Sequence, residues 1–120
     1  MEMIKLIKPY FSFEDDRGLI TGLAQEGIWK EINIIESKKG SRRGDHYHKK
    51  AVEMFIILSG KVKLYLQSEE DKERVMTLVV KKGDVFIVPP LVWHTFEILE
   101  DSQWINMLSE IVKDDMYKRE

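Results

Sequence analysis

The sequence contains no cysteine. That absence excludes a disulfide framework, a thiolate nucleophile and a thiolate zinc site, so any metal must be bound through nitrogen and oxygen atoms. The redox compartment is left open. Long apolar runs are also missing. The apolar run at the start of the chain is too short for a signal peptide, and no segment approaches the roughly 18 apolar residues of a transmembrane helix. We therefore expect a cytoplasmic protein without a membrane partner.

An excess of one charge is lacking as well. Lys and Arg number 19 against 21 Asp and Glu, which gives a formal charge of −2. This balance argues against a nucleic-acid partner and against a polybasic membrane patch. With 120 residues the chain can bury about two-thirds of its unfolded surface without disulfides. We expect a single domain over residues 1–120, with its core in about 30–110, N-terminal strands in 1–28 and a C-terminal tail in 111–120.

Short apolar runs between turn signals predict an all-β sandwich or barrel. Val62, Leu64 and Leu66 alternate with polar residues, which indicates a strand with one buried face. Ser59-Gly60 is expected to join two strands as a hairpin, and Gly18 to supply a positive φ in another hairpin. The expected strands cover residues 1–12, 29–36, 51–58, 61–66, 74–80, 85–88, 94–99 and 104–108. The expected hairpin covers residues 13–20, the polar and charged loops cover 38–45 and 68–73, and 110–120 is a short helix or a frayed tail.

All three histidines lie in two local motifs. The first runs Gly40, five residues, His46, one residue, His48, four residues, Glu53, six residues, Gly60. The second runs Gly83, five residues, Pro89, four residues, His94. This concentration of imidazoles suggests a single site.

Strand periodicity places the polar members of these motifs inside the molecule. His46 and His48 are two residues apart and so point the same way on a strand, while Glu53 and His94 share faces with large apolar residues. Burying such groups without partners is unfavourable, and a divalent metal would remove that cost. A structural histidine with ordinary hydrogen bonds is the alternative for any single position. Together, three imidazoles and a carboxylate leave open coordination positions, the pattern of a catalytic site, and suit Zn, Fe, Mn, Ni or Cu.

The paired motifs resemble the signature of the cupin superfamily. Every fixed position of the first motif fits, whereas the second has Leu91 where glycine is usual and Ile98 where asparagine is usual. The resemblance covers roughly residues 30–110. It implies a small single-domain cupin with an RmlC-like jelly-roll barrel, that is, a double-stranded β-helix. It also implies one divalent metal ion bound by His46, His48, Glu53 and His94.

Three shorter segments are similar to sugar-nucleotide 3,4-ketoisomerases and epimerases. They are Arg43-Gly44-Asp45-His46-Tyr47-His48-Lys49-Lys50, Pro90-Leu91-Val92-Trp93 and the turn Asp16-Arg17-Gly18, although Arg17 is also explained by the turn alone. Those ketoisomerases tend to carry glutamine at the Glu53 position and arginine at the His94 position, and they use the histidine pair as acid and base without a metal. Having both ligands, this chain is similar instead to the metal-binding cupin domain at the C-terminal end of capsular-polysaccharide sugar-nucleotide reductases.

The resemblance implies a metal-dependent isomerase or epimerase acting on a nucleotide-linked keto sugar. A proton α to a ketone would be abstracted to give an enediol, with the metal polarising the keto oxygen. His46, His48 and Tyr47 are the expected catalytic residues, and Arg43, with Arg42 as the alternative, would pair with the diphosphate.

Several side chains near the motifs have two possible roles. Lys49 is a possible proton carrier and substrate contact, and Trp93 could stack on a nucleobase or sugar. Tyr47 should face away from the histidines on a regular strand, so packing on the outer sheet is an equal alternative for it. Trp29 and Trp104 are expected in the core or in a dimer interface.

Two other functions use the same residues. A metal-dependent dioxygenase needs the same ligand set, and a non-catalytic small-molecule or sugar-binding cupin needs only the cavity. Exposed strand edges and three tryptophans favour a homodimer.

Overall fold

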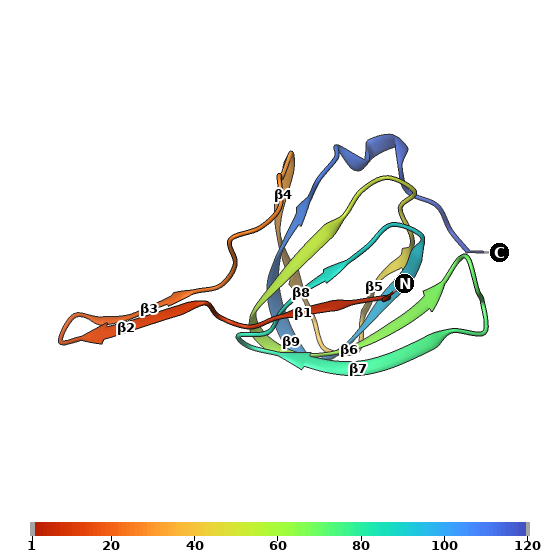
Figure 1. The fold of residues 1–120 in the computed structure, drawn as a ribbon. Helices are drawn as coiled ribbons and strands as arrows, with labels where there is room; N and C mark the ends of the chain where they lie inside the picture. The colour runs from red at the N-terminus through yellow and green to blue at the C-terminus, as the bar shows by residue number, and fades with distance from the viewer. Residues whose placement is uncertain (1, 120) are drawn as a thin grey trace.

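The computed structural model describes residues 2–119, so Met1 and Glu120, which end the predicted N-terminal strand and C-terminal tail, lie outside it. The described chain is almost entirely β, which confirms the predicted fold class (Figure 1). Its elements are β1 (Lys5–Ile7), β2 (Phe11–Asp15), β3 (Gly18–Gly22), β4 (Glu31–Ser37), β5 (Arg42–His46), β6 (Glu53–Ser68), β7 (Val75–Lys81), β8 (Val85–Val88), β9 (Val92–Leu108) and the 3-10 helix η1 (Val112–Asp114). Within residues 2–119 no helix is long and apolar enough to cross a membrane.

Two long strands, β6 and β9, organise the barrel. They pair antiparallel along nearly their whole lengths. Strands β8 and β1 extend the sheet from the first half of β6, β7 pairs with its second half, and β4 and β5 pair with the two halves of β9. The sheet therefore curls around a closed interior, as the ribbon shows (Figure 1).

The core lies inside this barrel. Val62, Leu64 and Leu66 are at most 1% exposed, which confirms the alternation expected from the sequence. Trp104 is also buried in this core, whereas Trp29 packs with Met54 in a second, smaller cluster on the outer face of the sheet. Both tryptophans thus take the packing role predicted for them.

The predicted hairpin at Ser59-Gly60 is wrong, because residues 53–68 form one continuous strand. Gly60 has a φ of 88° and lies at a register shift between β6 and β9. Opposite it, the Ser102 hydroxyl accepts the Lys61 N–H and donates to the Glu100 carbonyl. A bulge thus bends both strands at this point. The stretch around residues 100–102, which separates the expected strands 94–99 and 104–108, is likewise part of one strand, β9.

Other parts of the secondary-structure prediction have mixed outcomes. The polar loop over 38–45 is wrong in its second half, where β5 pairs with β9 although its side chains are polar. The hairpin over 13–20 is confirmed, and Gly18 has the expected positive φ of 132°. Leu91, at the position where cupins usually carry glycine, adopts a φ of 63°, so the backbone there keeps a conformation that glycine takes freely.

Alanine substitutions at Gly60 and Gly40 test how tightly the bend is packed. A Cβ at Gly60 would lie 2.5 Å from the Asp101 carbonyl oxygen, whereas Gly40, with a similar φ of 89°, has open space around it. Gly40→Ala should cost about 1 kcal/mol of backbone strain. Gly60→Ala should cost about 1–3 kcal/mol more, because it also overpacks the bulge. Urea unfolding of both variants measures the difference, and equal losses of unfolding free energy would contradict a tightly packed bend.

Candidate functional site

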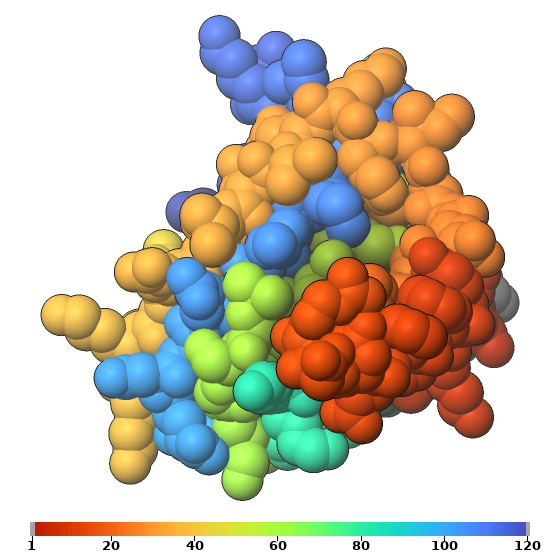
Figure 2. Space-filling model, turned by 90° about the vertical axis from the view of Figure 1, so that its left-hand side faces the viewer, coloured from red at the N-terminus to blue at the C-terminus, as the bar shows by residue number. Residues whose placement is uncertain are grey.

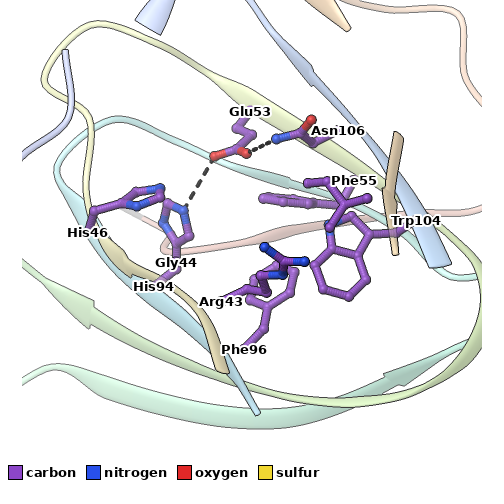
Figure 3. Close-up of a pocket in the computed structure, with 10 residues that line it drawn as sticks. Arg43, Gly44, His46, Glu53, Phe55, His94, Phe96, Trp104 and Asn106 are labelled. Atoms are coloured by element: carbon purple, nitrogen blue, oxygen red, sulfur yellow. Dashed lines mark hydrogen bonds and ion pairs between the residues drawn. The ribbon is translucent and has the colours of Figure 1, made fainter. Parts of the chain in front are cut away.

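A cavity of about 210 Å³ opens inside the barrel (Figure 3). Phe55, Phe96 and Trp104 form its apolar part. Its polar wall is formed by Arg43, His46, Glu53, His94 and Asn106. Strands β5, β6 and β9 contribute these groups, so residues distant in sequence meet in one place because β6 and β5 both pair with β9.

Glu53 is the centre of the polar wall. Its side chain is almost fully buried, and its Oε1 lies 3.2 Å from His48 Nε2 and 3.3 Å from His94 Nε2. Its Oε2 accepts a hydrogen bond of 2.8 Å from the Asn106 amide (Figure 3). Burial alone would raise the pKa of Glu53, but the hydrogen bonds and charges of His48 and His94 lower it well below its usual range. The carboxylate is therefore ionised.

His48 and His94 present the same edge of their rings to this carboxylate. His48 Nδ1 lies 2.6 Å from the Asp115 carbonyl oxygen, and His94 Nδ1 lies 3.1 Å from the Val92 carbonyl oxygen. A carbonyl oxygen only accepts, so each Nδ1 carries a proton and donates it. In a neutral ring Nε2 is then an acceptor that faces an anionic oxygen. Such an arrangement is stable only when a proton or a cation lies between the groups.

His46 completes the cluster from the end of β5. Its ring centroid lies 4.9 Å from that of His48 and 4.8 Å from that of His94. Burial, with smaller contributions from the two neighbouring imidazoles, lowers the pKa of His46 to about 4. Burial also acts to lower the pKa of His48, but Glu53 and the Asp115 carbonyl raise it above its usual value. The two adjacent imidazoles thus differ in proton affinity.

These four residues fit a divalent cation. Their ligand atoms lie within 4.8 Å of one another, three being imidazole nitrogens and one a carboxylate oxygen. Zn, Fe, Mn, Ni and Cu all accept this donor set. The carbonyl partners of His48 and His94 provide the outer hydrogen bonds that commonly orient metal-binding histidines. The sequence motifs therefore predicted a cluster that the fold does assemble, although His48 lies beyond the end of β5 rather than on a regular strand.

Arg43 lies on the cavity wall with part of its guanidinium already engaged. Nε donates to the Ser37 hydroxyl at 3.0 Å and Nη2 donates to the Glu36 carbonyl at 2.8 Å. These bonds fix the plane of the group, and its remaining N–H donors are available to an anion. Arg42, the alternative in the sequence, has its guanidinium over the Tyr65 ring instead.

Three further residues predicted for the site lie elsewhere. Tyr47 stacks on Tyr117, and the Lys49 ammonium lies 4.2 Å from the centre of that same Tyr117 ring. Trp93 donates from Nε1 to Asp45 and is covered by Arg119 at 3.6 Å. None of the three lines the cavity. Tyr47 does take the outward packing position given as its alternative, and the functional roles of all three stay predictions.

Two residues of the site were missed in the sequence. Asn106 orients Glu53, and Asp115 contacts His48 from the C-terminal segment. Asn106 had a signal, because it is a polar residue two positions after Trp104 on the inward face of a strand. Asp115 had none, since it stands in a charged stretch with no strand pattern.

Comparisons with known proteins agree with this geometry. Residues 13–120 match the family model described as the polysaccharide biosynthesis C-terminal domain. A germin-like protein of Arabidopsis thaliana, subfamily 1 member 6, is 29% identical over 75 residues, which cover 62% of this chain and 32% of that protein. The chain thus spans about a third of this curated relative's length.

Solved structures resemble the whole described barrel. A doubly substituted form of the 3,4-ketoisomerase QdtA from Thermoanaerobacterium thermosaccharolyticum, in complex with TDP, is 25% identical with a TM-score of 0.78, covering 99% of this chain and 89% of that one. A singly substituted form of the same enzyme, in complex with TDP-4-keto-6-deoxyglucose, is 22% identical with a TM-score of 0.79 and the same coverage. The likeness confirms the predicted jelly-roll fold.

The opposed pKa shifts give a direct test of the cluster in metal-free protein. Glu53→Gln removes the negative charge that raises the pKa of His48, so this pKa should fall. The pKa of His46, already about 4, should fall further because Glu53 also raises it. NMR titration of the imidazole signals measures both. Glu100→Gln, an exposed carboxylate on β9, is the matched control and should leave both pKa values unchanged; unchanged values in Glu53→Gln would contradict the assigned contacts.

Proposed function

The chain belongs to the polysaccharide biosynthesis C-terminal domain family and has the fold of the cupin superfamily, and from that premise we propose that it isomerises or epimerises a nucleotide-linked keto sugar with one divalent metal ion. The observation that carries the proposal is the cluster of three imidazoles and an ionised Glu53, of which His46, His94 and Glu53 line a partly apolar cavity. The neighbouring ketoisomerase, whose ligand is TDP-4-keto-6-deoxyglucose, supports the class of substrate.

The cavity size suits the sugar rather than the whole nucleotide. At about 210 Å³ it is smaller than the roughly 300–1,000 Å³ of pockets that enclose drug-sized ligands. A sugar ring would enter, and the nucleotide would remain outside. Arg43 lies on the wall with free guanidinium donors, and its planar group suits a diphosphate. Phe55, Phe96 and Trp104 would exclude water from the ring carbons.

The residues would divide the work as follows. His46, His48, His94 and Glu53 hold the metal, which when bound supplies Lewis-acid polarisation of a keto oxygen. Asn106 holds the Glu53 carboxylate in place. His46 is unprotonated at neutral pH, which suits a metal ligand and equally a base that takes the proton α to the ketone.

A metal-free route uses the same pair of histidines. Their pKa values are displaced in opposite directions, so His46 holds a proton less readily than His48, which favours His46 as the acceptor and His48 as the donor. Environments that separate the pKa values of neighbouring groups commonly assign acid and base roles. This route leaves the proposed substrate class unchanged and differs only in its need for the ion.

The function is tested by following solvent deuterium into TDP-4-keto-6-deoxyglucose by NMR, together with the metal content of untagged protein. Wild type and the control Glu100→Gln should hold one ion per chain and should catalyse exchange next to the ketone. Glu53→Gln should lose the ion, and exchange should fall about 100-fold or more, because a ligand and its charge are removed. His46→Ala separates its two roles: loss of the ion identifies a ligand, and loss of exchange alone identifies the base.

Other outcomes reassign the protein. Exchange that survives removal of the ion by a chelator would contradict metal dependence and favour the His46–His48 acid and base pair. Oxygen consumption with substrate would favour a dioxygenase. Binding of the nucleotide sugar without any exchange would overturn the enzymatic proposal in favour of a sugar-binding cupin.

The same chain also supports the predicted homodimer. Strands β2 and β3 form a separate hairpin that projects from the barrel, and Figure 2 views the molecule from the side of this hairpin. A two-stranded hairpin alone is marginally stable. Phe11, Phe13 and Ile20 share one of its faces and are 46%, 48% and 60% exposed. We propose that a second copy covers this face.

Exposed hydrophobic side chains are frequent in this part of the chain. Residues 6–34 include eight large hydrophobic side chains beyond Leu19 that are exposed: Leu6, Tyr10, Phe11, Phe13, Ile20, Ile28, Ile32 and Ile34. A second copy that covered the hairpin face would remove apolar surface from water, which favours association.

The hairpin provides matched variants for this proposal. Ile20→Ser places a polar group on the face shared with Phe13, and it should convert a dimer to monomer. Leu19→Ser makes the same kind of change at an equally exposed residue on the opposite face, and it should leave the dimer intact. Sedimentation velocity measures the mass. A monomeric wild type, or equal effects of the two substitutions, would contradict pairing through this face.

A further inference from the structure

The loop between β5 and β6, residues 47–52, carries His48 and connects His46 to Glu53, and it is held from outside the barrel. The N–H groups of Lys49, Lys50 and Ala51 all donate to the Asp115 carboxylate, at 2.8, 3.1 and 3.0 Å. The next N–H, that of Val52, donates to the Ser109 hydroxyl at 2.9 Å. Four consecutive amides of the loop are thus bound by side chains that follow β9.

Asp115 is buried and held in this position by its surroundings. It is 7% exposed although it lies in a charged segment after η1. Backbone bonds between Tyr47 and Tyr117, at 2.9 and 3.0 Å, close the segment against the loop on its other side. The C-terminal segment 109–117 therefore runs along residues 47–52 and contacts them at both ends.

Asp115 also contacts the cluster itself. Its backbone carbonyl accepts the His48 Nδ1–H at 2.6 Å, while its carboxylate holds the residues directly after His48. The equivalent partner of His94 is Val92, two residues earlier in the same strand. His94 is thus oriented by its own strand, whereas His48 depends on a residue 67 positions away.

This contact decides which nitrogen of His48 faces the cavity. With Nδ1–H donated to Asp115, a neutral ring presents the Nε2 lone pair toward Glu53. If the carbonyl moved away, the ring would gain by carrying its proton on Nε2 and donating it to the Glu53 carboxylate. Nε2 would then have no lone pair for a metal or a substrate proton.

We propose that Asp115 is a positioning residue, which clamps the loop after His48 and fixes the Nδ1–H tautomer of that imidazole. It acts through His48 and does not touch the cavity. The tautomer follows from the geometry alone, whereas its consequence for metal binding rests on the function proposed above.

The test reads the tautomer directly. In metal-free protein with 15N-labelled histidine, long-range proton–nitrogen NMR at a pH where His48 is neutral should show the Nδ1–H form in wild type. Asp115→Ala should shift His48 to the Nε2–H form, because three loop amides lose their acceptor and the segment moves. His94 should keep its form. In a parallel titration Co²⁺ affinity should fall about 10–100-fold, the usual effect of losing an outer hydrogen bond.

Two controls separate positioning from stability. Ser109→Ala weakens the same loop without a contact to His48, so it should lower the unfolding temperature but leave the tautomer and Co²⁺ affinity unchanged. Asp114→Asn, at the exposed neighbour of Asp115, should change neither. If Asp115→Ala does not fold, Asp115→Asn, which keeps the size and one acceptor oxygen, should show a smaller shift of the same sign.

The results distinguish the two proposals. A folded Asp115 variant with an unchanged His48 tautomer would overturn the positioning role whatever the protein catalyses. Absence of Co²⁺ binding in wild type, with the tautomer shifting in Asp115→Ala, would overturn the metal proposal and leave the positioning role standing.

Discussion

A carboxylate inside an apolar barrel has to be compensated, and the ionised Glu53 places this demand at the centre of the structure. Burial disfavours its negative charge, and three side-chain nitrogen atoms lie next to the carboxylate oxygens. They belong to His94 and Asn106 on β9 and to His48 in the loop after β5. The long pairing of β6 with β9 makes this possible, because it brings Glu53 on β6 close to His94 and Asn106 on β9. The rest of the barrel keeps water away from them.

The imidazoles compensate the charge of Glu53 fully only if a proton or a cation is shared between them and the carboxylate. Both imidazoles that face Glu53 have Nδ1 committed to a backbone carbonyl, so their Nε2 atoms meet the carboxylate as acceptors unless something positive is shared. A proton and a divalent cation are the two candidates, and they compete for the same place. The same set of nitrogen and oxygen atoms offers a place to either one.

The sequence predicted the all-β fold and the cluster of histidines and Glu53, because both depend on short-range patterns. Alternation at Val62, Leu64 and Leu66 reports a buried face directly, and fixed spacings report ligands on neighbouring strands. The bend at Gly60 was taken for a hairpin, since a glycine between two apolar runs has the same local signature in a turn and in a bulge. Only the partner strand distinguishes them, and it comes about 40 residues later, at Ser102.

Long-range polar contacts escaped prediction for a related reason. Asp115 is one acidic residue among several near the C-terminal end, and nothing in its neighbours indicates that it binds amides 64–66 positions away. Likewise Tyr47, Lys49 and Trp93 stand beside the motif histidines in sequence, yet adjacent residues of an extended chain point in opposite directions, and their rings and ammonium group pack outside the barrel.

The clamp of residues 47–52 by residues 109–117 has a consequence for biosynthesis. During translation the strands that carry His46 and Glu53 leave the ribosome well before Asp115 does, and until then the N–H groups of residues 49–51 and the His48 Nδ1 lack the acceptors that Asp115 supplies. A barrel that closed at that stage would hold His48 without the hydrogen bond that orients its ring. The His48 side of the site is therefore completed only after Asp115 has been synthesised.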